Sequence, residues 1–411
     1  MLPSESMVRD RVTKHTLVEI ARLPEVQKAD LGLLFTPSEI LQQPESWKET
    51  FGIIRDRQEE IRKFLRKGGL DGNNNQDVIV SLVGAGTSDY IGRSLTGLLR
   101  SKWGSHAASI PSTDLLTEID DFMASSPDNG RHVWLSFSRS GDSYEGVRSL
   151  EKAFEKFPDV QHIIVTCNAK SRMATDLSEG RENVLCLVLS DDVNDRGLAM
   201  TSSFTNMVVA GQSLANIDEL VNYETTLNAL VNAGKQALPA ISGLASELAG
   251  ESFERICFLG SGTLKAVADE SSLKVLELSA GYHSTMSESF LGLRHGPLSW
   301  LNRDALVVGF ISNNNEKAKV ELGLLDEIHR KHAAGRIVAI TPRLFDNIDA
   351  YTDHSVVLGT PEWLDDQYRP PLDVMFAQCF GLFSSLSQGL KPDSPSSDGK
   401  IHRVVSDINI I

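Results

Sequence analysis

Short apolar runs alternate along this chain with longer stretches in which apolar residues recur at helical spacing. The apolar runs at residues 78–83, 133–137, 163–167 and 184–189 predict buried strands. Helical spacing follows two of them, at residues 90–99 and 144–157. Strands that alternate with helices predict an α/β fold: a doubly wound parallel sheet with binding turns at the carboxyl ends of its strands.

The pattern occurs twice. Gly260-Ser-Gly-Thr263 repeats Gly84-Ala-Gly-Thr87 at an offset of 176 residues, and residues 307–315 and 336–341 repeat residues 133–141 and 162–167 at an offset of 174. We therefore expect two tandem copies of one α/β domain, joined by a helical stretch at residues 223–248. The predicted parts are a helical N-terminal arm (1–50), a first domain (51–222), a second domain (223–390) and a C-terminal tail (391–411).

Two helices are predicted before the first strand. Thr36-Pro-Ser-Glu39 has the spacing of a capping box, with proline at the first helical position, and predicts a helix start. A second helix is predicted from about Trp47 to Lys67, because apolar residues recur there on one face.

The turn Ser138-Arg-Ser-Gly-Asp-Ser143 joins a predicted strand to a predicted helix. The helix would present unpaired N–H groups to an anion, and the serine hydroxyls add donors. Gly141 allows close backbone approach, and Arg139 supplies a cation. Phosphate binding is one interpretation, and a surface turn with helix-capping serines is the other. The second copy has Ser312-Asn-Asn-Asn-Glu-Lys317 here, so only the first copy keeps an anion-binding turn.

Gly84-Ala-Gly-Thr-Ser88 resembles half of a dinucleotide-binding fingerprint. Asp89 stands where the third glycine belongs, and no acidic ribose partner follows at the required position. A nicotinamide-dependent enzyme is therefore not expected.

In the second copy, Lys274 and Glu277 lie three residues apart within an otherwise apolar run, so they share a helix face. A partly buried carboxylate beside a lysine would have opposing influences on its pKa and would suit a base of intermediate strength. An ordinary surface ion pair fits the spacing equally well. His295 precedes Gly-Pro, a pair that ends regular structure, which indicates either an imidazole able to exchange protons or a polar surface residue.

Composition narrows the class of protein. With 411 residues, 41% apolar and 23% charged, and no run of about 20 apolar residues, the chain reads as globular and cytoplasmic. Its four cysteines are far apart and form no C-x-x-C pair, which argues against disulfides and a cysteine metal site. A net charge of −15 disfavours nucleic acid and anionic membranes as partners.

Together, these motifs resemble the sugar isomerase (SIS) superfamily, in particular the isomerase half of glucosamine-6-phosphate synthase. The resemblance rests on the two-copy architecture and on Gly86-Thr-Ser88, Ser138–Ser143, Lys274-Val-Leu-Glu277 and Arg294-His-Gly-Pro-Leu298. Other stretches are similar to the tagatose-6-phosphate ketose/aldose isomerase family, which is associated with galactosamine-6-phosphate deamination and isomerisation. These stretches are residues 36–41, 194–205 and 276–281 and the tail Pro392-Asp-Ser-Pro395…His402-Arg-Val-Val405.

The resemblance implies roles for individual residues. Gly86, Thr87 and Ser88, with Ser138, Ser140 and Ser143, match positions around the sugar phosphate, and Arg139 replaces a glutamine of the synthase. Glu277 matches the proton-shuttling base, Lys274 its neighbouring lysine, and His295 a ring-opening histidine that comes from the other subunit, which implies a homodimer. No cofactor or metal is implied. The synthase's C-terminal lysine has no clear equivalent, and Lys400 and Arg403 are nearby candidates.

The expected activity is conversion of galactosamine 6-phosphate to tagatose 6-phosphate and ammonia. The synthase's glutaminase domain is missing, which favours the deaminating direction. Ketose/aldose isomerisation without deamination and glucosamine-6-phosphate deamination are alternatives. A non-catalytic sugar-phosphate sensor would need the serine turn but not Glu277 or His295.

Overall fold

The computed structural model describes residues 16–123, 131–396 and 398–404. Residues 1–15 of the predicted arm and residues 405–411 of the predicted tail, with Val405 of the tail motif, lie outside the described residues. The chain divides into two compact units. We call residues 45–194, 202–227 and 403–404 the first unit, and residues 16–44, 195–201 and 228–402 the second unit. The four-part division given above stays a prediction.

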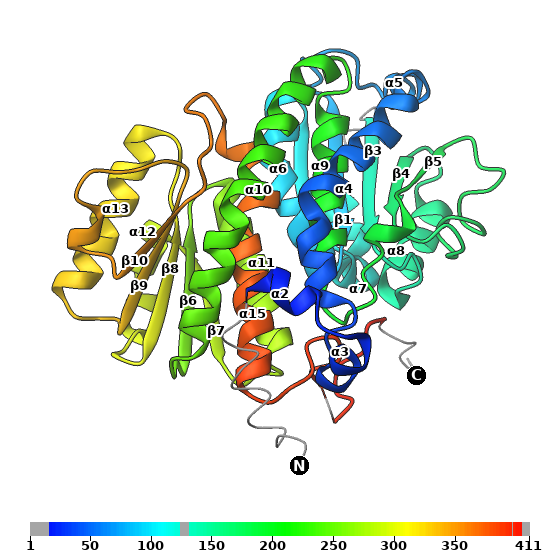
Figure 1. Ribbon diagram of the computed structural model, residues 1–411. Helices are drawn as coiled ribbons and strands as arrows, with labels where there is room; N and C mark the ends of the chain where they lie inside the picture. Colours follow the sequence, from blue (N-terminus) through cyan, green and yellow to red (C-terminus); the bar gives the residue numbers. More distant parts are fainter. Residues whose placement is uncertain (1–15, 124–130, 397, 405–411) are drawn as a thin grey trace. The chain divides into compact units, whose positions relative to one another are not determined.

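The first unit contains a five-stranded parallel sheet in the order β2-β1-β3-β4-β5 (Figure 1). Its strands are β1 (Val78–Gly84), β2 (His106–Pro111), β3 (Arg131–Ser138), β4 (Gln161–Thr166) and β5 (Val184–Val188). Its helices are α5 (Gln58–Lys67), α6 (Thr87–Trp103), α7 (Ser112–Met123), α8 (Tyr144–Lys156) and α9 (Ser202–Ala215), with the short helix η1 (Asp191–Val193).

Helices cover both faces of this sheet. Val83 and Trp134 pack in one core cluster with residues of α7 and α8. On the opposite face, α6 contacts β1 and α9 contacts both α6 and β4. Gly92 of α6 lies so close to the sheet that a Cβ there would come within 2.9 Å of Leu82 Cβ. The sheet is therefore doubly wound, as its sequence pattern predicts.

The second unit has a five-stranded parallel sheet in the order β10-β9-β8-β6-β7 (Figure 1). Its strands are β6 (Arg255–Gly260), β7 (Ser284–Ser289), β8 (Ala305–Phe310), β9 (Arg336–Thr341) and β10 (His354–Val357). Its helices are α2 (Leu17–Ala21), α3 (Glu25–Leu31), α11 (Thr263–Leu278), α12 (Phe290–Leu293), α13 (Asn315–Arg330), α14 (Pro370–Asp373) and α15 (Met375–Ser387), with η2 (Pro297–Trp300), η3 (Ile348–Ala350) and η4 (Asp366–Tyr368). The residues of α4 (Thr36–Asp56) and α10 (Leu220–Ala249) are divided between the two units.

The two sheets have the same topology, because β6 to β10 take the places of β1 to β5 in order. The turns after β1 and β6 also share one conformation. Gly86 has φ 55° and ψ −125°, and Gly262 has φ 57° and ψ −125°. These positive φ values favour glycine at both positions. The predicted pair of α/β copies is thus confirmed.

Two predictions about the N-terminal helices were wrong. The single helix predicted from about Trp47 to Lys67 is two helices, because α4 ends at Asp56 and α5 begins at Gln58. The predicted capping box does not form either. Asp393 takes its place and accepts hydrogen bonds from the Phe35 and Thr36 amides and the Thr36 hydroxyl. The Glu39 carboxylate instead accepts from the amides of Arg196 and Gly197, at 2.5 and 3.2 Å.

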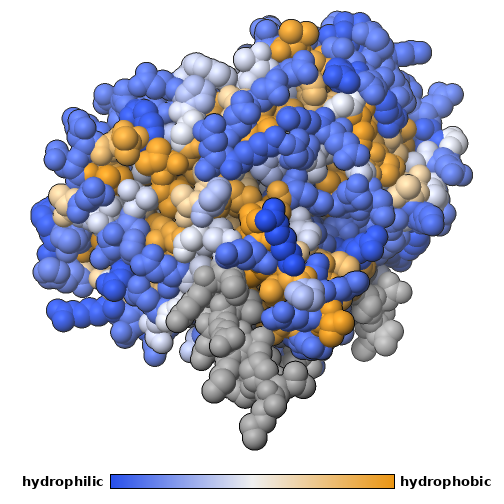
Figure 2. All heavy atoms as spheres, in the orientation of Figure 1, coloured by the Kyte–Doolittle hydropathy of each residue, from blue (hydrophilic) through white to orange (hydrophobic). Residues whose placement is uncertain are grey.

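Among the described residues, no helix is both long and apolar enough to cross a membrane. Hydrophilic residues cover much of the face seen in Figure 2, with apolar residues between them. The most exposed large apolar side chains are separated along the chain: Val26, Val221, Leu344 and Trp363. Singly exposed apolar residues of this kind are ordinary on protein surfaces.

Candidate functional site

The serine turn, residues Ser138–Ser143, runs from the last residue of β3 to the residue before α8. β1 and β3 are neighbours, yet the chain continues from β1 to one side of the sheet and from β3 to the other. Ligands of open α/β sheets bind at the carboxyl ends of strands beside such a switch in direction. The serine turn and the turn after β1 both lie at this place.

Backbone amides hold the serine turn in shape. Ser138 Oγ accepts a hydrogen bond from the Gly141 amide at 3.1 Å, and Ser140 Oγ accepts one from the Asp142 amide at 3.2 Å. Both hydroxyls therefore keep their own hydrogen to donate. Gly141 has φ 63°, and a Cβ there would lie 2.1 Å from Ser171 Oγ. Glycine is required at this position by both conformation and space.

The turn after β1 brings a second set of donors to the same edge. β1 and β3 pair in register, so Val83 lies opposite Ser136 and the turns that follow are adjacent. Thr87 and Ser88 begin α6 and are buried. The Ser88 and Asp89 amides donate to the carbonyls of Ala85 and Gly86 at 3.1 and 3.0 Å, so this turn would offer an anion its side-chain hydroxyls and the positive end of the α6 dipole.

Arg139 is 5% exposed, and its guanidinium donates a hydrogen bond to the backbone carbonyl of Arg403. Arg403 in turn donates to the side-chain oxygen of Asn194 at 2.8 Å. The other C-terminal candidate, Lys400, makes a 2.6 Å ion pair with Asp398. Of the two, Arg403 therefore lies beside the serine turn.

In the second unit, Lys274 and Glu277 form an ion pair on α11, with Nζ and Oε2 2.5 Å apart. Lys274 is fully buried, whereas the Glu277 side chain is 26% exposed. Burial lowers the pKa of Lys274, but its carboxylate neighbours outweigh burial and the pKa lies above its ordinary value. The lysine thus stays charged beside Glu277.

Glu270 was not identified as a candidate site residue in the sequence analysis. It lies one turn before Lys274 and is fully buried, with its Oε1 3.4 Å from Lys274 Nζ. The spacing from Glu270 to Lys274 to Glu277 is four and then three residues, which places all three on one helix face. Gly381 of α15 approaches this part of α11 closely, since a Cβ there would lie 3.3 Å from the Lys274 carbonyl oxygen.

His295 lies in the second unit as well, after α12 and before η2. Its side chain is exposed, and the next residue, Gly296, has φ 124°. Glu288, near the end of β7, has Oε1 2.6 Å from the amide of Ser289.

In the second copy, a side chain of the same unit binds the turn that corresponds to the serine turn. The Ser312 hydroxyl and the Asn313 amide both donate to the carboxylate of Asp366. Arg369, which is fully buried, pairs with Asp366 at 2.9 Å and with Asp373 at 2.6 Å. Burial raises the pKa of Asp373 to about 6, although Arg369 opposes the effect. A carboxylate of the chain itself therefore occupies the turn of the second copy that corresponds to the serine turn.

The predicted site residues fall into two groups. Gly86, Thr87, Ser88 and the serine turn gather at one sheet edge of the first unit, while Lys274, Glu277 and His295 belong to the second. Among the described residues, no group of three or more His, Cys, Asp or Glu side chains is arranged to hold a metal ion.

Comparison with known proteins gives one family match and three similar proteins. The SIS domain family model matches residues 251–380. A D-galactosamine-6-phosphate deaminase AgaS from Escherichia coli O157:H7 is 33% identical, over 92% of this chain and 95% of that protein. A tagatose-6-phosphate ketose/aldose isomerase structure from Escherichia coli has a TM-score of 0.80 and 31% identity, and covers 88% of this chain and 95% of its own. A proposed isomerase of the same name from Clostridium novyi has a TM-score of 0.88 and 28% identity, with coverage of 96% and 98%.

Proposed function

The chain belongs to the family of SIS-domain proteins that includes the D-galactosamine-6-phosphate deaminases AgaS, and from this premise we propose that it is an aminosugar-phosphate deaminase/isomerase. Galactosamine 6-phosphate is the proposed substrate, and tagatose 6-phosphate and ammonia are the proposed products. The observation that carries the proposal is that one copy keeps a serine turn with hydroxyl donors and the other keeps a buried Lys274 beside Glu277.

The serine turn is the proposed phosphate site. The hydroxyls of Ser138, Ser140 and Ser143 and the first amides of α8 are donors of the kind that a phosphate dianion accepts. Gly86, Thr87 and Ser88 supply the neighbouring turn. Arg139 and Arg403 add positive charge, although the Arg139 guanidinium donates to the Arg403 carbonyl.

Glu277 is the proposed base. His295 first opens the pyranose by moving a proton from the C1 hydroxyl to the ring oxygen. Glu277 then takes the C2 proton while the aldehyde oxygen gains a proton from solvent, which leaves an enolamine. Glu277 returns its proton to C1 and the nitrogen loses one to solvent, which leaves an imine at C2. Lys274 balances the charge of Glu277, and Glu270 positions Lys274. Water adds to the imine carbon and ammonia leaves, so C2 becomes the ketone of the product.

An aldose/ketose isomerase without nitrogen loss would use the same residues, and its support is the similarity to the Escherichia coli tagatose-6-phosphate ketose/aldose isomerase. Glucosamine 6-phosphate differs from the proposed substrate in the configuration of one hydroxyl and is a further alternative. A non-catalytic sensor would keep the serine turn alone. A homodimer with shared active sites in the cytoplasm also belongs to the proposal.

A substrate panel tests the activity directly. The purified protein is offered hexosamine 6-phosphates and ketose 6-phosphates while ammonia and ketose are assayed together. We expect both products in equal amounts from galactosamine 6-phosphate. Ketose without ammonia from every aminosugar would overturn deamination in favour of isomerisation, and binding without turnover would indicate a sensor.

A further inference from the structure

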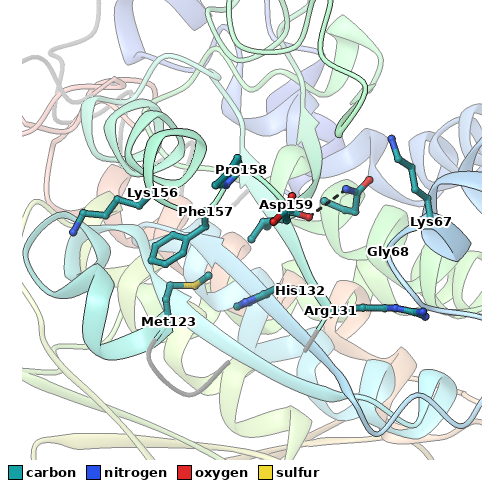
Figure 3. A pocket seen from close by; sticks show the side chains of 11 residues that line it. Lys67, Gly68, Met123, Arg131, His132, Lys156, Phe157, Pro158 and Asp159 are labelled. Carbon is teal, nitrogen blue, oxygen red and sulfur yellow. Dashed lines mark hydrogen bonds between the residues drawn. The ribbon is translucent and has the colours of Figure 1, made fainter. Parts of the chain in front are cut away.

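A pocket of about 370 Å³ opens in the first unit at the amino-terminal ends of β3 and β4 (Figure 3). We call it the basic pocket. Its volume is near the lower end of the range for small-molecule sites, about 300–1,000 Å³. Its lining comes from the ends of α5, α7 and α8, the starts of β3 and β4, and the loop before β4: Lys67, Gly68, Met123, Arg131, His132, Lys156, Phe157, Pro158, Asp159, Val160 and Gln161.

The basic pocket is separate from the serine turn. Arg131 begins β3 and Ser138 ends it, so the two sites lie at opposite ends of the same strand. Seven steps of about 3.3 Å place them about 23 Å apart along the strand. A ligand of the serine turn cannot reach the basic pocket.

Two nearly buried side chains on its wall have polar atoms without partners. Gln161 is 8% exposed and His132 is 6% exposed. Among the described residues, Gln161 Oε1 and His132 Nδ1 find no hydrogen-bond partner, while the other ring nitrogen of His132 bonds Ser81 Oγ at 2.8 Å. Such atoms are rare in native proteins, because each costs free energy unless something outside the chain satisfies it. Their place on a pocket wall points to a bound molecule.

The charge of the wall indicates the kind of molecule. The lining contains three cationic side chains, Lys67, Arg131 and Lys156, and a single carboxylate, Asp159, in a chain whose net charge is −15. Lys156 is paired with Asp120 at 2.6 Å, and Lys67 donates to the Glu182 carbonyl at 3.0 Å. The Arg131 guanidinium has neither an ion pair nor a hydrogen bond within the part of the chain that the structure describes.

The residues just after α5 pack closely against the Arg131 side chain. Gly69 has φ 89°, and a Cβ there would lie 2.2 Å from Arg131 Cδ. A Cβ at Gly68 would lie 2.7 Å from Val133 Cγ2, and it would be in ordinary contact with Gln161 Cγ at 3.4 Å. Figure 3 places Arg131 and Lys67 on one side of the pocket, Lys156 on the other and His132 between them. Gly69 thus makes room for the cation of Arg131 in a pocket that the unsatisfied Gln161 also lines.

We propose that the basic pocket is a second ligand site that binds a small hydroxylated organic anion, with its anionic group at Arg131 and Lys67 and a hydroxyl donating to Gln161. Sugar phosphates and hydroxycarboxylic acids share this chemistry. The Met123 and Phe157 side chains cover the apolar part of such a ligand. The inference does not depend on the reaction proposed above.

Calorimetric titration of the full chain tests the site. Ser138→Ala/Ser140→Ala serves as the background, which weakens binding at the serine turn. Tagatose 6-phosphate, citrate and inorganic phosphate are the three probes. We expect saturable binding of one of the two hydroxylated anions, and which one binds identifies the source. Arg131→Ala in this background should weaken that binding about tenfold or more, since it removes a charged hydrogen-bond donor.

Two further variants make the test specific. Arg148→Ala removes an exposed arginine of α8 that pairs with Glu151 away from the pocket, and it should leave binding unchanged. Gln161→Leu should weaken the hydroxylated probe but not inorganic phosphate. Hydrogen exchange should slow at residues 67–70 and 158–161 when the probe binds. The proposal is overturned if neither hydroxylated probe binds, or if Arg131→Ala and Arg148→Ala bind equally well.

Discussion

Ser138 and Ser140 differ from ordinary helix-capping serines in the groups to which their hydroxyls are hydrogen-bonded. Each accepts from an amide inside its own turn, and the residue that precedes α8 is Ser143, whose side chain makes no cap hydrogen bond. The two hydroxyls therefore shape the turn and still have a hydrogen to offer a ligand.

Replacing both serines should raise KM sharply. In Ser138→Ala/Ser140→Ala, two donors to a dianion are lost, and each contributes about 1.5–3 kcal/mol. Steady-state kinetics with galactosamine 6-phosphate measures the effect. Asn314→Ala is the matched control, because Asn314 caps α13 at the corresponding turn of the second copy. Its KM should be unchanged, and an unchanged KM in the folded double variant would reject the phosphate site.

Glu277 and Glu288 are the two carboxylates to be separated as candidate bases. Glu277 pairs with a fully buried lysine, whereas Glu288 lies beside the Ser289 amide. Glu277→Gln should abolish exchange of the C2 hydrogen with deuterated solvent while sugar phosphate still binds. Glu288→Gln should retain the exchange. Mass spectrometry of recovered substrate distinguishes the variants, and the reverse result would move the role of base to Glu288.

At the scale of elements, the start of α4 depends on residues distant in sequence. Asp393 caps it from the tail, and Glu39 binds the loop at Arg196 and Gly197. Burial, reinforced by the nearby Asp195 carboxylate, raises the pKa of Glu39 to about 8. A titratable group thus lies where three segments of the second unit meet.

This group should make stability depend on pH. The unfolded chain releases the Glu39 proton near its ordinary pKa of 4.5, whereas the folded chain holds it up to about 8. The folded state binds more protons between these values, so the free energy of unfolding should fall as pH rises through them. Urea unfolding of Glu39→Gln at about pH 5 and about pH 8 should show a smaller fall than the parent chain. Glu25→Gln, at an exposed position of α3, should behave like the parent. An equal fall in Glu39→Gln would exclude Glu39 as its source.

The elements that sequence reasoning found and missed differ in position. Interior strands such as β3 and β4 are continuous apolar runs, because helices cover them on both faces. β2, β7 and β10 were missed, and all three are edge strands, whereas the fourth edge strand, β5, has an apolar run and was found. β7 reads Ser-Thr-Met-Ser-Glu-Ser and has no apolar run to detect. Edge strands are partly open to solvent, so they need fewer apolar residues.

For the site, the features that could be predicted are those whose residues lie close together in the sequence. The serine turn and the Lys274–Glu277 pair are local in sequence, so spacing was enough to suggest them. Glu270 was also within reach of spacing, since it continues the same helix face. The contact between Arg139 and Arg403 spans 264 residues, and no local pattern indicates it. Asp393 capping α4 is a further long-range contact of this kind.

For the whole molecule, the proposal includes a dimer in which His295 of one chain completes the site of its partner. Equal amounts of Glu277→Gln and His295→Ala chains, refolded together, should put about half of the molecules in mixed dimers. Each mixed dimer has one site with both residues intact, so activity should recover to about a quarter of the parent value. Activity no greater than that of the separate variants, despite demonstrated mixed dimers, would rule out the shared site.

Because the Asp366 carboxylate occupies the turn of the second copy, the two copies would differ in how their stability depends on metabolite concentration. The second unit carries its anion as part of its own chain, so that turn is saturated as soon as the unit folds. Under the proposed function, the serine turn of the first unit binds a phosphate instead, and binding would stabilise this unit as the ligand concentration rises above the dissociation constant. The stability of the second unit would therefore not depend on a bound anion, whereas the stability of the first unit would rise with the concentration of its ligand. When the concentration of the sugar phosphate is low, the free energy of unfolding of the first unit alone would fall. This unit would then unfold and be proteolysed more readily than when the ligand is abundant.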